Sequence, residues 1–541
     1  MNNKATTGKA EPFFITTAIP YVNAAPHIGF ALELVLTDAI ARFQRLNGKD
    51  VWFLTGTDEN SLKNVQAAER EGIPVRQLVD RNAKVFEALR PLLDLSFDQF
   101  IRTSVDEKHA EGVRRIWQAC EKSGDLYKKN YKGLYCVGCE QFYTEAELDN
   151  GCCKEHLTRP EVIEEENYFF SLTRYQDQLL DLIESDKLEI LPRSRKTEVL
   201  SFLRNGLADF SVSRSRARAH GWGLPVPGDE EQVIYVWFDA LVNYISALGY
   251  AKDSPEFERF WKDCSERVHA IGKGITRFHA VYWPAILLSA GLPLPSKLYV
   301  HGYVTVGGAK IGKSLGNVIA PASLVDEYGC DSLRYFLLRD FPADRDSDFT
   351  AERLISRHNS DLVGKLGNLL NRTVTMVSRY SEGKIPVPGV ASSQDEAFVA
   401  QCCALPELVT SAIADYQPNQ ALSDIFDVVA AANKYIQDCK PWELAKARSA
   451  DGAGATDAED RLRSVLYILC QSLHIVAYCI APFLPATADG IAAQLGTGIE
   501  SAGLAQFAKF GALPSGHPIV GGPLLFKKLV EPVAALDAVD D

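Results

Sequence analysis

Residues Phe13 to Phe30 read FFITTAIPYVNAAPHIGF, and the rest of the chain is organised around this stretch. Its first part, from Phe13 to Ala18, is an uncharged run of apolar and β-branched residues, a pattern typical of a strand buried on both faces of a parallel sheet. Pro20 and Pro26 exclude the continuation of a strand or a helix through the residues that follow. The stretch therefore predicts a buried strand that leads into a loop.

The residues after this loop predict an amphipathic helix. Its apolar positions recur at i, i+3, i+4, i+7, i+8 and i+11, namely Leu32, Val35, Leu36, Ala39, Ile40 and Phe43. Gly48 is expected to cap the helix, and VWFLT at 51–55 predicts a second buried strand. His27 and Gly29 then lie where a strand leads into a helix N-terminus, whose backbone N–H groups attract a phosphate. Gly29 allows that phosphate to approach the backbone.

Composition and length indicate an ordinary globular protein with several domains. At 541 residues, a chain with about 150 residues per domain is expected to form three or four. Hydrophobic residues make up 46% and charged residues 23% of the chain. No apolar run is as long as a membrane span, and the polar N-terminus lacks the core of a signal peptide. We expect a cytoplasmic protein with no membrane partner, whose 12 cysteines are reduced unless they bind metal.

The net charge of −13 argues against a nucleic-acid partner, because phosphates are neutralised by lysine and arginine. Binding depends on local patches, however, and basic residues gather in two segments. These are Arg193, Arg195, Lys196, Arg204, Arg214, Arg216 and Arg218 in the first, and Arg353, Arg357, Lys365, Arg372 and Arg379 in the second. For either segment alone, solvated surface charge is the favoured interpretation.

A metal site is predicted within a region of short aromatic strands and turns. Cys136 and Cys139 form a C-x2-C knuckle, and Cys153 with His156 forms C-x2-H. Four such ligands suit a closed, tetrahedral Zn²⁺ site of structural type, although unrelated buried thiols are the alternative. Cys152 is a spare, since Cys153 keeps the two-residue spacing to His156.

Three further places carry candidate ligand residues at strand ends or on helix faces. Asp58 follows the second strand, where it either faces the crevice of an open sheet or caps the next helix. IGKG places Gly272 and Gly274 at another strand end, where a nucleotide can approach closely. Two helix faces bear aromatic and apolar groups that are otherwise explained as core: Trp237, Leu241 and Tyr244 on one, His279 and Trp283 on the other.

The sequence KIGKS, from Lys310 to Ser314, lies in a glycine-rich segment that is expected to be mobile. Lys310 and Lys313 offer flexible ammonium groups that can follow negative charge as it grows on a leaving group.

Beyond about Arg353 the pattern is almost wholly helical. Asn368 and Arg372 share a helix face, and Trp442 follows Pro441 at a helix start. An amide, a guanidinium and an indole together suit the reading of single-stranded bases, while a packed tryptophan and a surface arginine are the alternative.

Two of these stretches resemble, in the right order, motifs of one enzyme family. AIPYVNAAPHIGF resembles the HIGH motif of class I aminoacyl-tRNA synthetases in the form carried by methionyl-tRNA synthetases, and HGYVTVGGAKIGKSLGN (residues 301–317) resembles their KMSKS loop. A lone loop histidine is more often hydrogen-bonded to a nearby carbonyl. Two motifs in the family order favour a catalytic His27 instead.

The resemblance implies a methionine–tRNA ligase reaction, with ATP, Mg²⁺, methionine and methionine tRNA as partners. It implies catalytic roles for His27, Lys310 and Lys313, and anticodon reading by Asn368, Arg372 and Trp442. The implied ATP site is Pro26, His27, Gly29, Phe30, Gly272, Gly274, His301, Lys310, Lys313 and Ser314. The implied methionine site is Ile19, Tyr21, Asp58, Trp237, Leu241, Tyr244, His279 and Trp283.

The expected fold is α/β, with a class I Rossmann-type catalytic domain, a zinc-ribbon connecting insertion and a C-terminal α-helical bundle that binds the anticodon. We expect the catalytic halves at 12–125 and 226–300, the insertion at 126–225, the KMSKS-like and stem-contact region at 301–355 and the anticodon-binding domain at 356–541. No appended dimerisation domain is apparent, so a monomer is expected.

The sequence departs from the family motifs at several positions near the nucleotide. Phe30 stands where the second histidine of HIGH is usual, Gly274 replaces an aspartate, Asn60 and Ser61 replace histidine and glycine, and Ile311 and Gly312 replace methionine and serine. These departures leave open a tRNA-binding or regulatory paralogue without full ligase activity. A synthetase for valine, isoleucine, leucine or cysteine is a third reading, although the first three need an editing insertion of some hundreds of residues.

Overall fold

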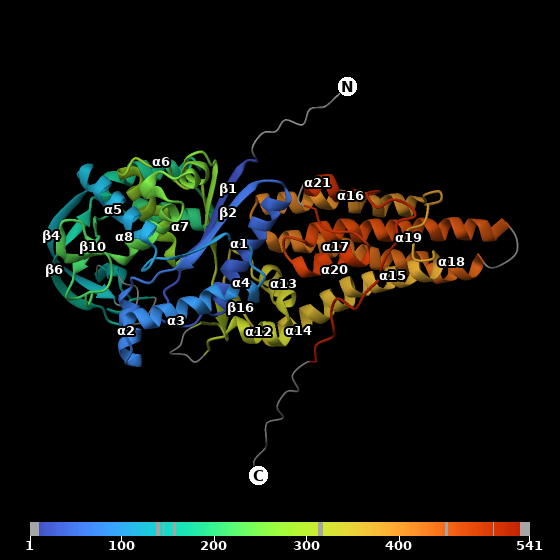
Figure 1. Cartoon of the computed structure of the whole chain (residues 1–541), viewed down its shortest axis with the longest axis horizontal. Helices are drawn as coiled ribbons and strands as arrows, with labels where there is room; N and C mark the ends of the chain where they lie inside the picture. Colours follow the sequence, from blue (N-terminus) through green and yellow to red (C-terminus); the bar gives the residue numbers. More distant parts are fainter. Residues whose placement is uncertain are drawn as a thin grey trace, which may run out of the picture. The chain divides into compact units, whose positions relative to one another are not determined.

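The computed structural model describes residues 10–136, 141–143, 145–154, 158–311, 317–448, 453–500 and 503–530 (Figure 1). The chain forms two compact units, and each is described by itself. The first comprises Met1–Glu33, Asp50–Pro91 and Ser96–His301, and the second comprises Leu34–Lys49, Leu92–Leu95 and Gly302–Asp541.

The first unit is built on a six-stranded sheet in which every neighbouring pair is parallel. In spatial order the strands are β3 (Gln99–Arg102), β2 (Asp50–Thr57), β1 (Pro12–Thr17), β12 (Glu266–Gly272), β13 (Lys297–His301) and β7 (Glu189–Leu191). The buried strands predicted at 13–18 and 51–55 are β1 and β2, which lie side by side in Figure 1. The predicted Rossmann-type parallel sheet is confirmed.

The order of the strands places a crevice next to β1. From β1 the chain moves outward to β2 and β3, and much later it returns to the other side of β1 as β12 and β13. In open parallel sheets, ligands bind at the carboxyl ends of the strands where the direction of winding reverses. This point lies between β1 and β12, so the residues that follow Thr17 and Gly272 are the place where a ligand is expected.

Helix α1 (Ile28–Leu46) follows the loop after β1, as the periodicity predicts. It is buried on more than one side, since Leu34, Thr37 and Asp38 are covered as well as the predicted apolar stripe. Gly48 follows it with φ of +83°, the left-handed conformation expected of a glycine at a helix end. Its residues up to Glu33 belong to the first unit and those from Leu34 to the second.

The first unit contains further helices. They include α2 (Leu62–Glu71), α3 (Val75–Glu87), α4 (Leu89–Leu92, whose last residue belongs to the second unit), α5 (Glu107–Lys122), α6 (Gln176–Glu184), α7 (Arg193–Arg204), α10 (Pro255–Phe257) and α11 (Trp283–Ser289). The single helix predicted around Trp237 is instead two short ones, α8 (Val236–Leu241) and α9 (Asn243–Ser246). Val242 joins them with a right-handed helical backbone, so both run in one general direction.

The segment between α5 and α8 forms two small antiparallel sheets, as the short strands and turns predict, but it also contains α6 and α7, which that pattern did not predict. One has the order β5 (Gln141–Tyr143), β4 (Leu126–Cys136), β6 (Glu161–Phe170), β8 (Phe210–Ser211), and the other β10 (Pro225–Val226), β11 (Asp229–Ile234), β9 (Ser213–Ser215). The predicted knuckle begins at Cys136, the last residue of β4, which pairs with Gln141 of β5.

The second unit is mainly helical, which confirms the predicted C-terminal bundle. A small sheet of β15 (Ala309–Lys310), β14 (Val304–Val306) and β16 (Ser347–Asp348) precedes it. The helices are α12 (Pro321–Tyr328), α13 (Cys330–Asp340), α14 (Ala351–Arg357), a π-helical segment His358–Gly367, α15 (Asn368–Tyr380), α16 (Ser393–Ala414), α17 (Pro418–Cys439), α18 (Pro441–Ala447), α19 (Ala453–Ile480), α20 (Pro485–Gln494) and α21 (Leu504–Phe507). Figure 1 shows α15, α17 and α19 running alongside one another.

Helices α16 and α19 are long and apolar enough to cross a membrane by length and composition alone, which the sequence reading did not anticipate. The apolar window of α19 is 89% buried inside the bundle, the situation of a core helix in a globular protein. The corresponding share for α16 is 39%.

A fully buried ion pair lies in the core of the second unit. Arg334 of α13 is 2.8 Å from Asp38 of α1, and neither side chain is exposed. The Arg334 guanidinium also donates to the carbonyl oxygens of Phe483, Pro482 and Leu93. A single side chain therefore joins α1, α13 and the segments next to Leu93 and Phe483.

Replacing Arg334 by methionine is expected to lower the free energy of unfolding by about 3–5 kcal/mol, because a buried carboxylate and several carbonyl groups lose their donor. Urea denaturation of the purified variant measures the loss. Lys434→Met is the matched control, since its partner Asp438 lies at the surface and an exposed pair contributes about 0–1 kcal/mol. Equal effects of the two substitutions would contradict a structural role for the buried pair.

Candidate active site

His27 closes the N-terminus of α1 with its own ring. The backbone N–H of Gly29 donates to His27 Nδ1 at 3.0 Å, and the N–H groups of Phe30 and Ala31 point to the His27 carbonyl oxygen. Since a backbone N–H only donates, Nδ1 is the acceptor, and a neutral ring carries its proton on Nε2. The Nε2–H therefore belongs to an imidazole that is fixed at the N-terminus of α1.

Gly29 is required here for a reason that the sequence did not reveal. A Cβ at this position would lie 2.9 Å from Cε1 and 3.0 Å from Nδ1 of the His27 ring, closer than side chains approach one another. The space above Gly29 is thus filled by His27 itself. The predicted close approach to the backbone is made by this imidazole in the structure, and an approach of phosphate stays a prediction.

Phe30 packs against aromatic and apolar side chains. Its ring lies 5.4 Å from that of Phe86 in an edge-to-face arrangement, and it borders a small apolar cluster that includes Val79, Phe100 and Trp222. Such aromatic pairs contribute about 0.5–1.5 kcal/mol beyond the area they bury. Phe30, which stands where a second histidine is usual, therefore packs as part of an apolar cluster.

Glu33 is a site residue that sequence reasoning missed. It lies on α1, 6% exposed, and its carboxylate accepts the N–H of Ala18 at 2.8 Å and contacts His301 Nε2 at 2.9 Å. A Cβ on Gly272 would lie 3.7 to 3.9 Å from His301 and Glu33. The ends of β1, β12 and β13 and the first turns of α1 therefore meet at one carboxylate. A charged residue inside an apolar helical stretch was the available signal.

Asp58 is 2% exposed and follows β2, where its backbone pairs with Tyr21 as an isolated bridge. Its N–H donates to the carbonyl oxygen of Pro20 at 2.9 Å. The cap of α2 is Ser61 instead, whose hydroxyl accepts the N–H of Lys63. The alternative reading of Asp58 as a helix cap is therefore wrong, and the structure brings Asp58 and Tyr21 together.

Asn60 joins a buried polar network behind α8. Its amide donates to Asp239 Oδ2 at 2.7 Å, and the other carboxylate oxygen of Asp239 is 2.7 Å from His109 Nε2. His109 in turn contacts Ser246 of α9 through Nδ1 at 2.9 Å. The departures at Asn60 and Ser61 thus have structural roles, because Asn60 holds the helix that carries Trp237 and Ser61 caps α2.

Trp237 and Tyr21 form the first aromatic group of the predicted methionine site. The Trp237 ring stacks on the Phe278 ring, with 3.8 Å between the ring centroids and an interplanar angle of 7°. It also contacts Tyr21 edge to face, with 6.3 Å between the ring centroids. The indole N–H of Trp237 is buried and has no hydrogen-bond partner among the residues that the structure describes. Buried donors of this kind are rare and call for an explanation such as a ligand.

Tyr244, His279 and Trp283 form the second aromatic group. His279 Nδ1 lies 3.0 Å from the Ile275 carbonyl oxygen, so it donates, and His279 Nε2 accepts the hydroxyl of Tyr244 at 2.7 Å. Burial lowers the pKa of His279 to about 4 and raises the pKa of Tyr244, so both groups are neutral near pH 7. The ring centroids of Tyr244 and Trp283 lie 6.1 Å apart.

The other predicted ligand residues are distributed as follows. Ile19 is partly buried against the main core of the first unit, Leu241 and Pro26 are buried, and Gly274 is exposed. Lys310 lies in the second unit, exposed, with its Nζ 4.4 Å from the Tyr303 ring. Lys313 and Ser314 lie outside the described residues.

The predicted metal ligands are described only in part. Cys136 and Cys153 are buried, and the Sγ of Cys153 lies 3.6 Å from the hydroxyl of Tyr143 on β5. Cys153 is therefore next to the strand that pairs with Cys136, whereas Cys152 is half-buried. Cys139 and His156 lie outside the described residues, and the described part of the chain contains no metal-ligand cluster.

The second unit brings together the three predicted anticodon residues. Arg372 of α15 lies with its guanidinium 5.8 Å from the Trp442 ring at the start of α18. Asn368, one turn before Arg372, is exposed and donates weakly to Asn433 of α17 at 3.3 Å. An indole, a guanidinium and an amide therefore gather on one part of the bundle.

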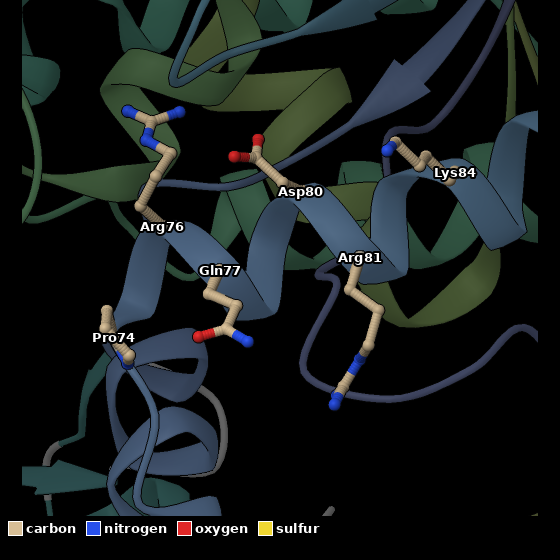
Figure 2. A pocket seen from close by; sticks show the side chains of 6 residues that line it. All are labelled: Pro74, Arg76, Gln77, Asp80, Arg81 and Lys84. Carbon is tan, nitrogen blue, oxygen red and sulfur yellow. The ribbon is translucent and has the colours of Figure 1, made fainter.

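A groove of about 560 Å³ lies along α3, apart from the predicted ligand residues (Figure 2). Figure 2 shows Gln77 and Arg81 on one side of the helix and Arg76, Asp80 and Lys84 on the other. Arg81 is paired with Glu71 and Asp80 with Arg102. These pairs account for two of the charged residues that line the groove, and the groove contains none of the predicted site residues.

Comparison with known proteins agrees with this geometry. The family model described as tRNA synthetases class I (M) matches residues 13–159 and 146–374. The parallel sheet, the crevice beside β1 and the HIGH-like turn at α1 thus define a class I aminoacyl-tRNA synthetase. The model described as anticodon binding domain of methionyl tRNA ligase matches residues 385–535.

Individual proteins make the assignment narrower. Methionine–tRNA ligase of Brucella suis is 46% identical over 483 residues, covering 88% of this chain and 90% of that protein. The ligase of Caldanaerobacter subterraneus is 43% identical, covering 96% and 79%. The solved structure of Mycobacterium tuberculosis methionyl-tRNA synthetase in complex with methionyl-adenylate has a TM-score of 0.89 and 39% identity, covering 95% and 99%. The chain belongs to the methionyl-tRNA synthetase family.

The low pKa of His279 predicts a pH-dependent stability. In the unfolded chain this histidine titrates near 6.5, so the unfolded state binds the proton more tightly than the folded state, whose pKa is about 4. The free energy of unfolding is expected to fall by about 3 kcal/mol on this account as the pH drops from 6.5 to 4. Urea denaturation across this range should show a correspondingly smaller fall for His279→Gln, and an unchanged fall would contradict a buried neutral imidazole.

Proposed function

We propose that this protein is a methionine–tRNA ligase that forms methionyl-adenylate from methionine and ATP and transfers the methionyl group to methionine tRNA. The observation that carries the proposal is the Glu33–His301 pair, which joins the helix that follows His27 to the end of β13. The aromatic residues come from α8 and α9, which follow β11, and from the segment that follows β12. Membership in the family and the relatives reported above support it.

Methionine is proposed to bind at the two aromatic groups. Asp58 holds the α-amino group as a buried carboxylate next to Tyr21. The thioether lies among Ile19, Tyr21, Trp237, Leu241, Tyr244, His279 and Trp283, where contacts between sulfur and aromatic rings add to burial. The unpartnered indole N–H of Trp237 supports a ligand at this place.

ATP is proposed to bind across the N-terminus of α1 and the ends of β12 and β13. The methionine carboxylate attacks the α-phosphate in line and pyrophosphate leaves, without a covalent enzyme intermediate. The Nε2–H of His27 is the donor that stabilises charge growing on the α-phosphate. Pro26, Gly29, Phe30, Gly272, Gly274 and His301 line this part of the proposed site.

Lys310 and Lys313 are proposed to neutralise the leaving pyrophosphate, with Ser314 beside them in the same segment. This role rests on the resemblance of KIGKS to the KMSKS loop and on the chemistry of a flexible ammonium. Mg²⁺ bound to the phosphates supplies further charge neutralisation when present.

Methionine-dependent exchange between ATP and pyrophosphate tests this function. The purified protein should catalyse exchange with methionine and with none of the other common amino acids, and His27→Ala should lower the rate about 10²–10³-fold, because one transition-state donor is lost. His220→Ala is the control, a half-exposed histidine of the same unit that pairs with Glu69. A folded protein that binds tRNA but shows no exchange would favour the alternative of a regulatory paralogue, for which the comparisons give no support.

A structural Zn²⁺ is proposed at Cys136, Cys139, Cys153 and His156. The burial of Cys136 and Cys153 and the placement of Cys153 against Tyr143 of β5 support this choice over Cys152. A closed site of this type orders a small module that lacks a large core.

Metal analysis of the purified protein should find about one Zn per chain, since four ligands close one tetrahedral site. Cys153→Ser is expected to lose the metal, and Cys152→Ser, the neighbouring thiol that is only half-buried, is expected to retain it. Loss in both variants would show that the third ligand is assigned wrongly.

Anticodon reading is proposed for Asn368, Arg372 and Trp442, whose gathering on α15 and α18 supports it. Trp442→Ala should weaken aminoacylation of methionine tRNA by about 1–3 kcal/mol, the value of one stacked base, and leave pyrophosphate exchange unchanged. Tyr467→Ala removes another half-buried aromatic ring from the same bundle and should leave both activities unchanged. A parallel loss of exchange in Trp442→Ala would indicate a structural role instead.

We also propose that the protein is a cytoplasmic monomer that does not associate with membranes. The burial of α19 inside the bundle supports the part of this proposal that concerns membranes.

A further inference from the structure

His269 is a buried histidine that no family motif singled out. It lies on β12, 0% exposed, directly opposite Thr16 of β1 in the register of the sheet. Its Nδ1 is 2.8 Å from the hydroxyl oxygen of Thr16, and its Nε2 is 3.3 Å from the indole nitrogen of Trp283. Both ring nitrogens of His269 are therefore engaged by defined partners.

The partners determine which nitrogen carries the proton. An indole N–H can only donate, so Nε2 of His269 is the acceptor of the Trp283 hydrogen bond. A neutral ring then carries its proton on Nδ1 and donates it to Thr16. Burial lowers the pKa of His269 well below its usual value, which keeps the ring neutral and the acceptor available.

The same imidazole also contacts the second aromatic side chain of the site. The rings of His269 and Tyr244 lie 4.0 Å apart with an interplanar angle of 30°. Tyr244 donates its hydroxyl to His279, and that bond depends on the ring of Tyr244 keeping its present orientation. His269 thus touches Trp283 through a hydrogen bond and Tyr244 through its ring face.

We infer that His269 is a positioning residue of the methionine pocket, which fixes the orientation of Trp283 through its Nε2 acceptor and that of Tyr244 through its ring. This inference rests on the proposed function, because it assigns the residue a part in methionine recognition. Without the acceptor, the Trp283 N–H would be buried without its partner, and the indole would turn to find another. Methionine binding is then weakened, and the nucleotide subsite is not touched.

Three substitutions separate the roles of the two nitrogens. His269→Gln places an amide oxygen near the position of Nε2 and retains an acceptor for Trp283. His269→Asn reaches only the position of Nδ1, and His269→Phe keeps a ring with neither nitrogen. The KM for methionine in pyrophosphate exchange is expected to rise about tenfold in the Asn and Phe variants, the typical effect of one buried unsatisfied donor, and less than about threefold in the Gln variant. The KM for ATP should change less than about twofold in all three.

The Trp283 indole N–H provides a spectroscopic readout. In ¹⁵N-tryptophan-labelled protein, its NMR signal, assigned with Trp283→Phe, should move in His269→Asn and remain close to the wild-type position in His269→Gln. His474→Phe is the matched control, because His474 is a buried histidine of the second unit that bonds to the Phe507 carbonyl oxygen. It should affect stability without changing the KM for methionine.

The possible results distinguish a failure of the proposed function from a failure of the role inferred for His269. No methionine-dependent exchange in the unsubstituted protein would overturn the proposed function itself. An active protein whose Gln and Asn variants show the same KM for methionine, or whose Asn and Phe variants bind methionine normally, would overturn the role of His269 alone. If the Phe variant does not fold, the comparison of Gln with Asn decides the question.

Discussion

The carboxylate of Glu33 joins the ends of β1 and β13 to α1. It accepts the N–H of Ala18 at the end of β1 and contacts His301 at the end of β13, while its own backbone belongs to α1. A buried carboxylate without such partners would be costly, so the arrangement in which all three elements meet is strongly favoured. The position of His27, less than two turns before Glu33, depends on the same constraint.

Three of the departures from the family motifs, at Phe30, Asn60 and Ser61, are integrated into their surroundings. Phe30 completes an apolar cluster with Phe86, Asn60 binds Asp239 behind α8, and Ser61 caps α2. A chain that had merely lost its function would not be expected to provide partners for these three replacements. Gly274 is exposed at the end of β12, and nothing in the structure explains its replacement of an aspartate.

The proposed pocket for the methionine side chain is built from neutral groups whose polar atoms bind one another. His279 receives the Tyr244 hydroxyl, and His269 receives the Trp283 indole, while each imidazole donates its own proton to a backbone or hydroxyl oxygen. Burial keeps both imidazoles uncharged. An uncharged, preorganised surface of this kind suits a thioether, which has little to gain from a charge and much from dispersion contacts.

The sequence by itself determined the buried strands β1 and β2, helix α1, the helical second part and the place of His27, because hydrophobic periodicity and proline positions act locally along the chain. Only the tertiary structure decided the partners of Glu33 and His269, which lie 268 and 253 residues away. It also decided that α8 and α9 are separate and that Gly29 accommodates the His27 ring. Hydrogen bonds between distant strands leave no periodic signal, since each depends on the register of a sheet that forms only when the chain folds.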